Sequence, residues 1–200
     1  TLGLALIYGV MKILHVAHAS VYTAGAYMGL YLYTATGSMF IAILGSMAFC
    51  ACLGVLIERY IYFPLLKYPP YVPLISSIAL LIAIEELCRL VAGPEVRTFP
   101  ANLPFPTLVI SGITISSTLI AVYCISAAVL LLLWLLMTKT ELGLAMRAVS
   151  QDMETASALG VNTQRTVALT FVIGSAIAAI AGILVGIYYN QVYPMMGEVP

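Results

Sequence analysis

The chain is divided into long apolar runs that carry no charge, and this division restricts its fold more than any motif does. Residues 116–137 and 167–187 contain no Asp, Glu, Lys or Arg, and both reach the ~20 residues that a helix needs to cross a bilayer. Charged residues make up 8% of the chain and hydrophobic residues 62%, whereas roughly 25% of a soluble domain is charged. We therefore predict an all-α fold, a polytopic bundle of transmembrane helices.

The predicted spans are joined by short polar loops. They are the end of a first span up to residue 14, a second up to about residue 36, and residues 39–57, 71–90, 117–137 and 167–187. Two short β-prone runs flank Ser111 and Gly112, which predicts a small external β-hairpin around residues 108–115. Because the chain begins inside an apolar run without Met, we expect residues 1–200 to be one transmembrane domain lacking the first part of its first span and its last spans.

Basic residues are divided unequally between the two sets of loops. One set carries Arg59, Lys67, Lys139, Arg147 and Arg165, with Lys12 nearby, and the other set carries Arg89 and Arg97. The positive-inside rule places the first set in the cytoplasm. The formal net charge is +0, and the absence of a basic patch argues against nucleic acid as a partner.

Residues 138–166 form the longest polar interval of the chain. Apolar or small residues recur there near helical spacing, at Leu142, Ala145, Met146 and Val149 and again at Met153, Ala156 and Leu159. Gly160 follows, where a helix C-terminus is expected. We predict two short amphipathic helices on the cytoplasmic face with a break near residues 150–152. They are either a solvated connector or an element that docks onto a soluble partner.

Two histidines, His15 and His18, occur where the first span gives way to the second. A spacing of three would place both on one helix face, as in a metal site, but two ligands without a nearby carboxylate are too few, so we predict no metal. Ionisable groups at membrane depth tend to face the bundle interior or a water path. We therefore expect these histidines near the cytoplasmic side or beside a polar cavity.

Small residues predict close helix packing. Gly25 and Gly29 form a GxxxG pattern. A longer stripe recurs every four residues in the last span and predicts a tight contact between helices or subunits: Gly174, Ala178, Gly182 and Gly186. We expect the four cysteines, which form no CxxC pair, to be small buried hydrophobes: Cys50, Cys52, Cys88 and Cys124.

Several motifs together resemble the branched-chain amino-acid ABC transporter permease family, over nearly all 200 residues. The run ILHVAHASVYTAGAY is similar to the family signature NFAHGxxYxxGAY; it matches at His18, Tyr22, Gly25, Ala26 and Tyr27 and departs at His15, Val16 and Ala19. The run RAVSQDMETASALGVNTQRTVALTFVIGSAIAAIAGIL resembles the family's coupling loop and following helix. ERYIYFPLLKYPP and GPEVRTFP resemble two further family stretches, the first with Phe63 and Leu66 replacing basic residues.

The resemblance implies a permease subunit of an ABC importer, in a bacterial or archaeal inner membrane. In that family residues 138–166 correspond to a cytoplasmic coupling loop that docks onto separate ATPase subunits. A second permease subunit, identical or homologous, and an external substrate-binding protein complete the importer. The coupling residues that it implies are Arg147, Asp152, Met153, Glu154, Ala156, Leu159 and Gly160, and the translocation-path residues are His15, His18, Tyr22 and Gly25.

The chain has no GxxxxGK[ST] motif, no HExxH helix and no Ser/His/Asp set, so we expect neither an enzyme nor a cofactor. The expected solutes are leucine, isoleucine and valine or a related small polar molecule such as an amide. The alternative is a proton- or ion-coupled secondary transporter that uses Glu85, Glu86 and the two histidines as a relay. Arg89 lies three and four residues after these glutamates, so an ion-paired helix end is the plainer interpretation of that cluster.

Overall fold

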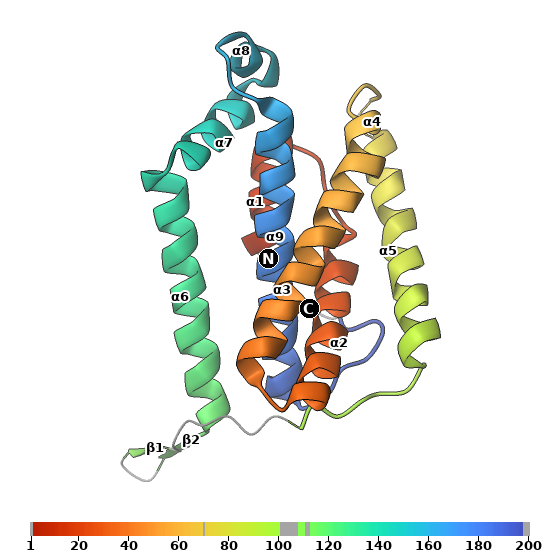
Figure 1. Cartoon of the computed structure of the whole chain (residues 1–200), viewed down its shortest axis with the longest axis vertical. Helices are drawn as coiled ribbons and strands as arrows, with labels where there is room; N and C mark the ends of the chain where they lie inside the picture. The colour runs from red at the N-terminus through yellow and green to blue at the C-terminus, as the bar shows by residue number, and fades with distance from the viewer. Residues whose placement is uncertain (1, 70, 101–107, 111–112, 198–200) are drawn as a thin grey trace.

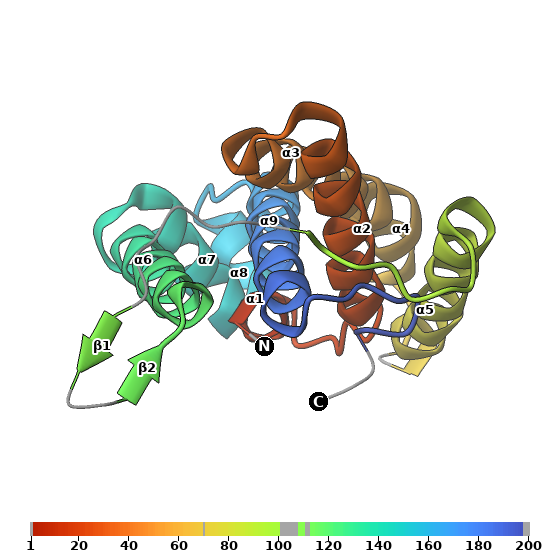
Figure 2. The same cartoon turned by 90° about the horizontal axis from the view of Figure 1, so that it is seen from below.

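The longest helix, α9 (Thr163–Tyr189), is the axis around which the other helices pack. The computed structural model describes residues 2–69, 71–100, 108–110 and 113–197. Three helices contact α9 along its length: α1 (Leu2–Met11), α2 (His18–Thr36) and α3 (Met39–Ile57). Seen from below, α5 (Tyr71–Ala92) lies on one side of this group, against α2, and α6 (Ser117–Lys139) lies on the other (Figure 2).

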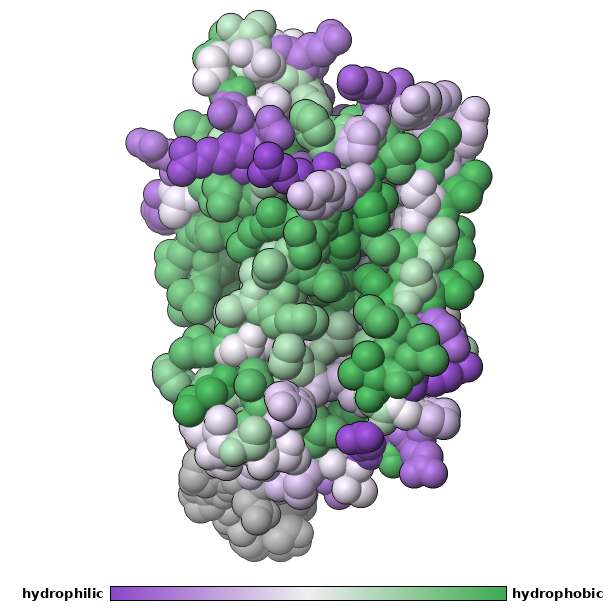
Figure 3. Space-filling model, turned by 45° about the vertical axis from the view of Figure 1, so that its right-hand side comes forward, coloured by the Kyte–Doolittle hydropathy of each residue, from purple (hydrophilic) through white to green (hydrophobic). Residues whose placement is uncertain are grey.

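The surface has the division that a membrane protein requires. On the face shown in Figure 3, apolar side chains form a belt across the middle of the molecule, and polar side chains gather towards its ends. Within the described residues, three helical runs are long and apolar enough to cross a membrane: Met39–Leu65, Thr118–Lys139 and Thr163–Tyr189. The predicted class, an all-α bundle of transmembrane helices, is confirmed.

Two short helices, α7 (Glu141–Gln151) and α8 (Met153–Ala158), lie at one end of the bundle. The same end holds α4 (Phe63–Leu65), whereas the opposite end holds β1 (Leu108–Ile110) and β2 (Ile113–Ile115) (Figure 1). The strands pair antiparallel with Val109 opposite Thr114, as the hairpin prediction required, although its turn at residues 111–112 lies outside the described residues. The α7–α8 segment and the β-hairpin therefore lie at opposite ends of the bundle.

Glycines allow the backbones of α2 and α9 to touch. A Cβ at Gly25 would lie 2.7 Å from the Cα of Ala179, and one at Gly29 would meet the side chain of Ile183. From the other side, a Cβ at Gly182 would overlap the carbonyl oxygen of Tyr22. Such approach without side chains between the backbones is how membrane helices gain dispersion contacts where no hydrophobic effect drives them together.

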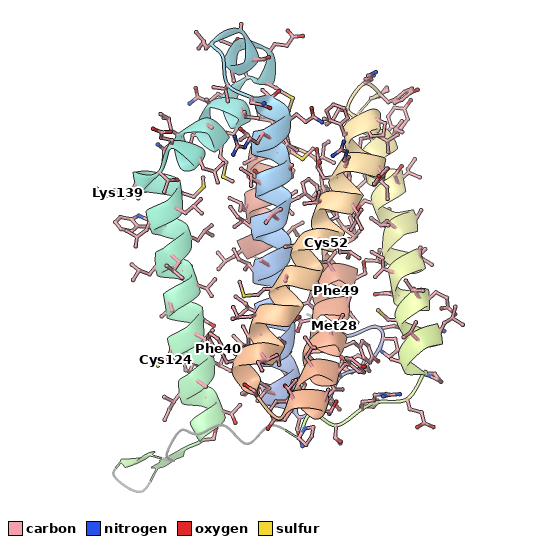
Figure 4. All side chains as sticks on the ribbon, in the orientation of Figure 1. Met28, Phe40, Phe49, Cys52, Cys124 and Lys139 are labelled. Carbon is pink, nitrogen blue, oxygen red and sulfur yellow. The ribbon has the colours of Figure 1, made fainter. Side chains whose placement is uncertain are left out.

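Several predicted boundaries were wrong. The third span does not end at Ile57, because the helix continues through a π-helical turn, η1 (Glu58–Tyr62), into α4. The last helix begins at Thr163, where Asn162 caps it, not at residue 167. Among the cysteines, Cys52 and Cys124 are exposed on the outer faces of α3 and α6, so the expectation that all four are buried does not hold (Figure 4).

Candidate functional site

The α7–α8 segment starts and breaks where polar side chains cap helix ends. The hydroxyl of Thr140 accepts a hydrogen bond from the amide of Gly143 (3.1 Å). Asp152 accepts from the amides of Glu154 (2.9 Å) and Thr155 (3.1 Å). These bonds satisfy amides that have no partner in the first turn of a helix. The predicted break near residues 150–152 is confirmed at Asp152, but its cause, an N-cap, was not recognised from the sequence.

One face of this segment is packed into the bundle. Met146, Val149 and Ala156 are buried there in one cluster with Val10 of α1 and Val167 of α9. Arg147 donates from its guanidinium to the carbonyl of Met137, which fixes the corner between α6 and α7. The helix α7 contacts α1, α6 and α9, so it links three helices of the bundle.

The other face is exposed at the tip of the segment. Leu159 is 80% exposed, and Asp152, Glu154 and Gly160 are also exposed. Gly160 has φ of +90°, a conformation that side-chain-bearing residues rarely adopt, and this ends α8. Of the residues predicted for coupling, Met153 is half-buried and Ala156 is buried, so these two hold the segment in place instead of presenting a surface.

The cap of α8 is expected to weaken in acid. Hydrogen bonds from Thr155 and Glu154 lower the pKa of Asp152 below its ordinary value of 3.8. A carboxyl whose folded pKa is depressed stabilises the fold above its unfolded pKa, and this contribution is lost as the pH falls through the folded value. Amide exchange in residues 153–158, corrected for intrinsic rates, should therefore rise as the pH drops below 3.8.

Two comparisons control this prediction. Asn162 caps α9 in the same way but does not titrate, so the first turn of α9 should keep its protection over the same range. Asp152→Asn should keep a cap while losing the pH dependence. Equal loss of protection at both caps would indicate general acid unfolding and contradict the assignment.

The second set of predicted site residues, which includes His15 and His18, lies between α1 and α2, where the backbone is not helical. Residues 12–15 have no regular structure, and Lys12 has φ of +55°. The helix α2 begins at His18 beside the middle of α9, because a Cβ at Gly3 would meet both His18 and Gly174. The segment descends from the end of α1 to this point (Figure 1). Both histidines lie where the first helix gives way to the second, as the sequence indicated, with His15 before α2 and His18 at its start.

Side chains from other elements fasten this segment. His15 is 1% exposed, and its Nδ1 lies 2.7 Å from the hydroxyl of Tyr62 in η1. The amide of Ala17 donates to the hydroxyl of Ser77 in α5 (3.0 Å). Non-helical backbone at membrane depth is stable only where protein or water satisfies its polar groups. Ser77 does this for the amide of Ala17, and Tyr62 bonds to the buried side chain of His15. Sequence reasoning missed both because the contacts span distant parts of the chain.

A cavity of about 760 Å³ lies beside the start of α2. Its lining includes two predicted path residues, His18 and Tyr22, together with Tyr189, Gln191 and Tyr193 near the other end of the bundle. Of the remaining two, His15 packs against Phe171, and Gly25 lies at the contact between α2 and α9. The motifs do not include Tyr189 or Tyr193, and only the fold brings them to this cavity.

Comparison with known proteins assigns this architecture. The sequence profile of the family described as branched-chain amino acid transport system, permease component, matches residues 1–198. The chain belongs to this family. The resemblance inferred from the motifs is thereby confirmed.

Individual relatives agree with the family profile. The permease is 30% identical to the high-affinity branched-chain amino acid transport system permease protein BraD of Pseudomonas aeruginosa, over 98% of this chain and 68% of the relative. It is 29% identical to LivH of Escherichia coli K12, with the same coverage. A shorter match, 34% over 56% of this chain and 32% of the relative, joins it to the galactofuranose transporter permease protein YtfT of the same organism. No solved structure matches.

The remaining predicted residues of the permease lie in two places. The small-residue stripe of α9 faces inward: Gly174 packs against Ile7 of α1, Gly182 against α2, and Gly186 against Val192 and Phe99. At the end of α5, Arg89 forms an ion pair with Glu86 (3.5 Å), with both side chains about half exposed, whereas Glu85 is buried. The ion-paired helix end accounts for Glu86.

Proposed function

We propose that this permease is the membrane-spanning subunit of an ABC importer that moves leucine, isoleucine, valine or a related small polar solute across the inner membrane of a bacterium or archaeon. Separate ATPase subunits drive it, a second permease subunit completes the membrane unit, and an external binding protein delivers the solute. BraD and LivH, which carry branched-chain amino acid transport in their names, support this choice of solute.

The observation that carries the proposal is the form of residues 138–166. The segment is folded, capped and packed on one face, yet its tip at α8 presents Leu159 and Glu154 to solvent beyond the apolar belt. An exposed leucine on a rigid projection is an anchor suited to a groove on a soluble partner. The permease itself would hydrolyse nothing, and its role is to change conformation when the partner pushes on α8.

The contacts of α7 provide a path by which a movement of α8 can reach the transmembrane helices. From α8 the force reaches α7, which packs on the end of α1 and on α9. The end of α1 leads directly into the non-helical residues 12–15 and the cavity beside His18. In this proposal the junction between α1 and α2 has two alternative packings, and closure of the ATPases favours one of them.

The test is the energy source of transport. The full-length permease, reconstituted in proteoliposomes with its ATPases and binding protein, should take up labelled leucine when ATP is supplied to the ATPase side. An imposed proton gradient without ATP should drive no uptake. Uptake that follows the gradient and is lost in Glu85→Gln would instead establish a proton-coupled carrier, the alternative that the buried Glu85 leaves open.

A further inference from the structure

The cavity beside α2 differs from a second, larger cavity of the permease in its position and in the charge of its lining. The other, about 1010 Å³, lies between α2, α3 and α5, is lined by Met28 and Phe49 (Figure 4), and has Glu95 and Arg97 in its lining. The cavity beside α2 lies between α1, α2 and α9, the elements that the proposed movement of α7 displaces. A site that must open to alternate sides belongs with the moving elements.

The lining of this cavity is polar but uncharged. Among the described residues that line it there is no Asp, Glu, Lys or Arg. Its polar groups are the phenols of Tyr22, Tyr189 and Tyr193, the amide of Gln191 and the imidazole of His18. Phenol and amide groups both donate and accept hydrogen bonds.

The rest of the wall is aliphatic. Ile177, Ala181 and Val185 of α9 face the cavity across from Leu14 and Val16 of the non-helical segment. The imidazole of His18, which also lines the cavity, is 7% exposed. The volume, about 760 Å³, falls in the range of small-molecule sites.

We propose that this cavity is the transmembrane binding site for the transported solute, which carries no net charge and joins a polar head to an aliphatic chain. The head bonds to Tyr22, Tyr193 and Gln191, and the chain lies against Ala181 and Val185. An amino-acid zwitterion with an aliphatic side chain has this form, whereas a lysine or a glutamate would bring an unpaired charge into a wall that cannot neutralise it. The direction in which the solute is transported rests on the proposed function, whereas binding of the solute in this cavity does not depend on it.

Binding is measured on the purified full-length permease without ATPase, so that it is independent of energy coupling. Val185→Cys is introduced after Cys52, Cys88 and Cys124 are replaced by alanine, and labelling by a thiol reagent is followed. L-leucine at ten times its dissociation constant should slow labelling roughly tenfold, because only the free site reacts. A matched variant that keeps Cys124, exposed on α6, as its accessible thiol should label at the same rate with and without leucine.

The shape of the site is tested by filling it. Ala181→Leu should raise the KM for leucine at least about tenfold while changing that for alanine less, because a pocket discriminates by the methylenes it can hold. Ala128→Leu makes the same change on the exposed face of α6 and should leave both values unchanged. Tyr193→Phe should raise KM about tenfold through one lost hydrogen bond to a charged group, whereas Tyr123→Phe, 71% exposed, should not.

The outcomes separate the two proposals. Protection by urea or acetamide but not by leucine would support the cavity and overturn the branched-chain substrate. Protection by lysine or glutamate as strong as that by leucine would overturn the uncharged site. Leucine uptake by the reconstituted importer, with no protection of residue 185 and equal kinetics for Ala181→Leu and Ala128→Leu, would overturn the cavity while the proposed function stands.

Discussion

Gly182→Ala is expected to unfold the permease at a markedly lower temperature than the wild type. The added methyl group would overlap the carbonyl oxygen of Tyr22, and a backbone atom cannot rotate away as a side chain can. Overpacking of this kind costs roughly 3 kcal/mol, which corresponds to a fall of about 6–12 °C in the midpoint of thermal unfolding for a chain of this size. The midpoint is measured in detergent by the loss of the monodisperse species.

Gly9→Ala is the matched control for this variant. Gly9 also lies inside a helix, but no heavy atom lies within 4 Å of the position its Cβ would take. Alanine favours a helix interior over glycine by about 1 kcal/mol, so this variant should be as stable as the wild type or slightly more stable. Equal destabilisation at both positions would mean that α2 and α9 do not approach as closely as described.

Leu159→Asp is expected to uncouple the permease from its ATPases while leaving it folded. The side chain is 80% exposed and contributes little to the permease's own core, so the thermal midpoint should not change. If Leu159 anchors the partner, its loss removes an interface hot spot of about 2 kcal/mol, which is roughly a 30-fold loss of affinity. Co-purification of the ATPases and ATP-driven leucine uptake should fall together.

The control for this variant compares truncations of two leucines that are both largely exposed. Leu159→Ala should weaken the association measurably, whereas Leu132→Ala, 66% exposed on α6 within the apolar belt, should not. A substitution at Gly160 would not test docking alone, because the positive φ of Gly160 means that any side chain there strains the end of α8. Normal ATPase binding by Leu159→Asp would place the docking surface elsewhere.

Periodicity and helix-end residues predicted the coupling segment well because its structure is local. The break at Asp152 and the end at Gly160 depend on residues within a few positions of each. The cavity was predictable only in part. His18 and Tyr22 were identified from a motif, whereas Tyr189 lines the cavity as the last residue of α9. Tyr193 lies in the chain after α9, which folds back to α2, where the amide of Gly197 donates to the hydroxyl of Thr23 (3.0 Å).

The same contrast explains the boundaries that were missed. A polar, aromatic stretch containing Pro64 predicts a loop, yet the helix continues through a π-helical turn into α4. Pro64 lies in the first turn of α4, where a missing amide hydrogen is tolerated. The start of α2 at His18 was not predictable from spacing, since its position depends on Tyr62 and Ser77, each more than forty residues away.

The non-helical backbone before α2 ties any movement of the permease to hydration. In a continuous helix each amide keeps its partner when the helix tilts, but the amide of Ala17 depends on Ser77 in α5, and His15 depends on Tyr62 in η1. If α5 or η1 separates from this segment, these groups must find new partners, and lipid offers none. Water must therefore enter as the helices part, so the wetting of this region and the opening of the permease are one event.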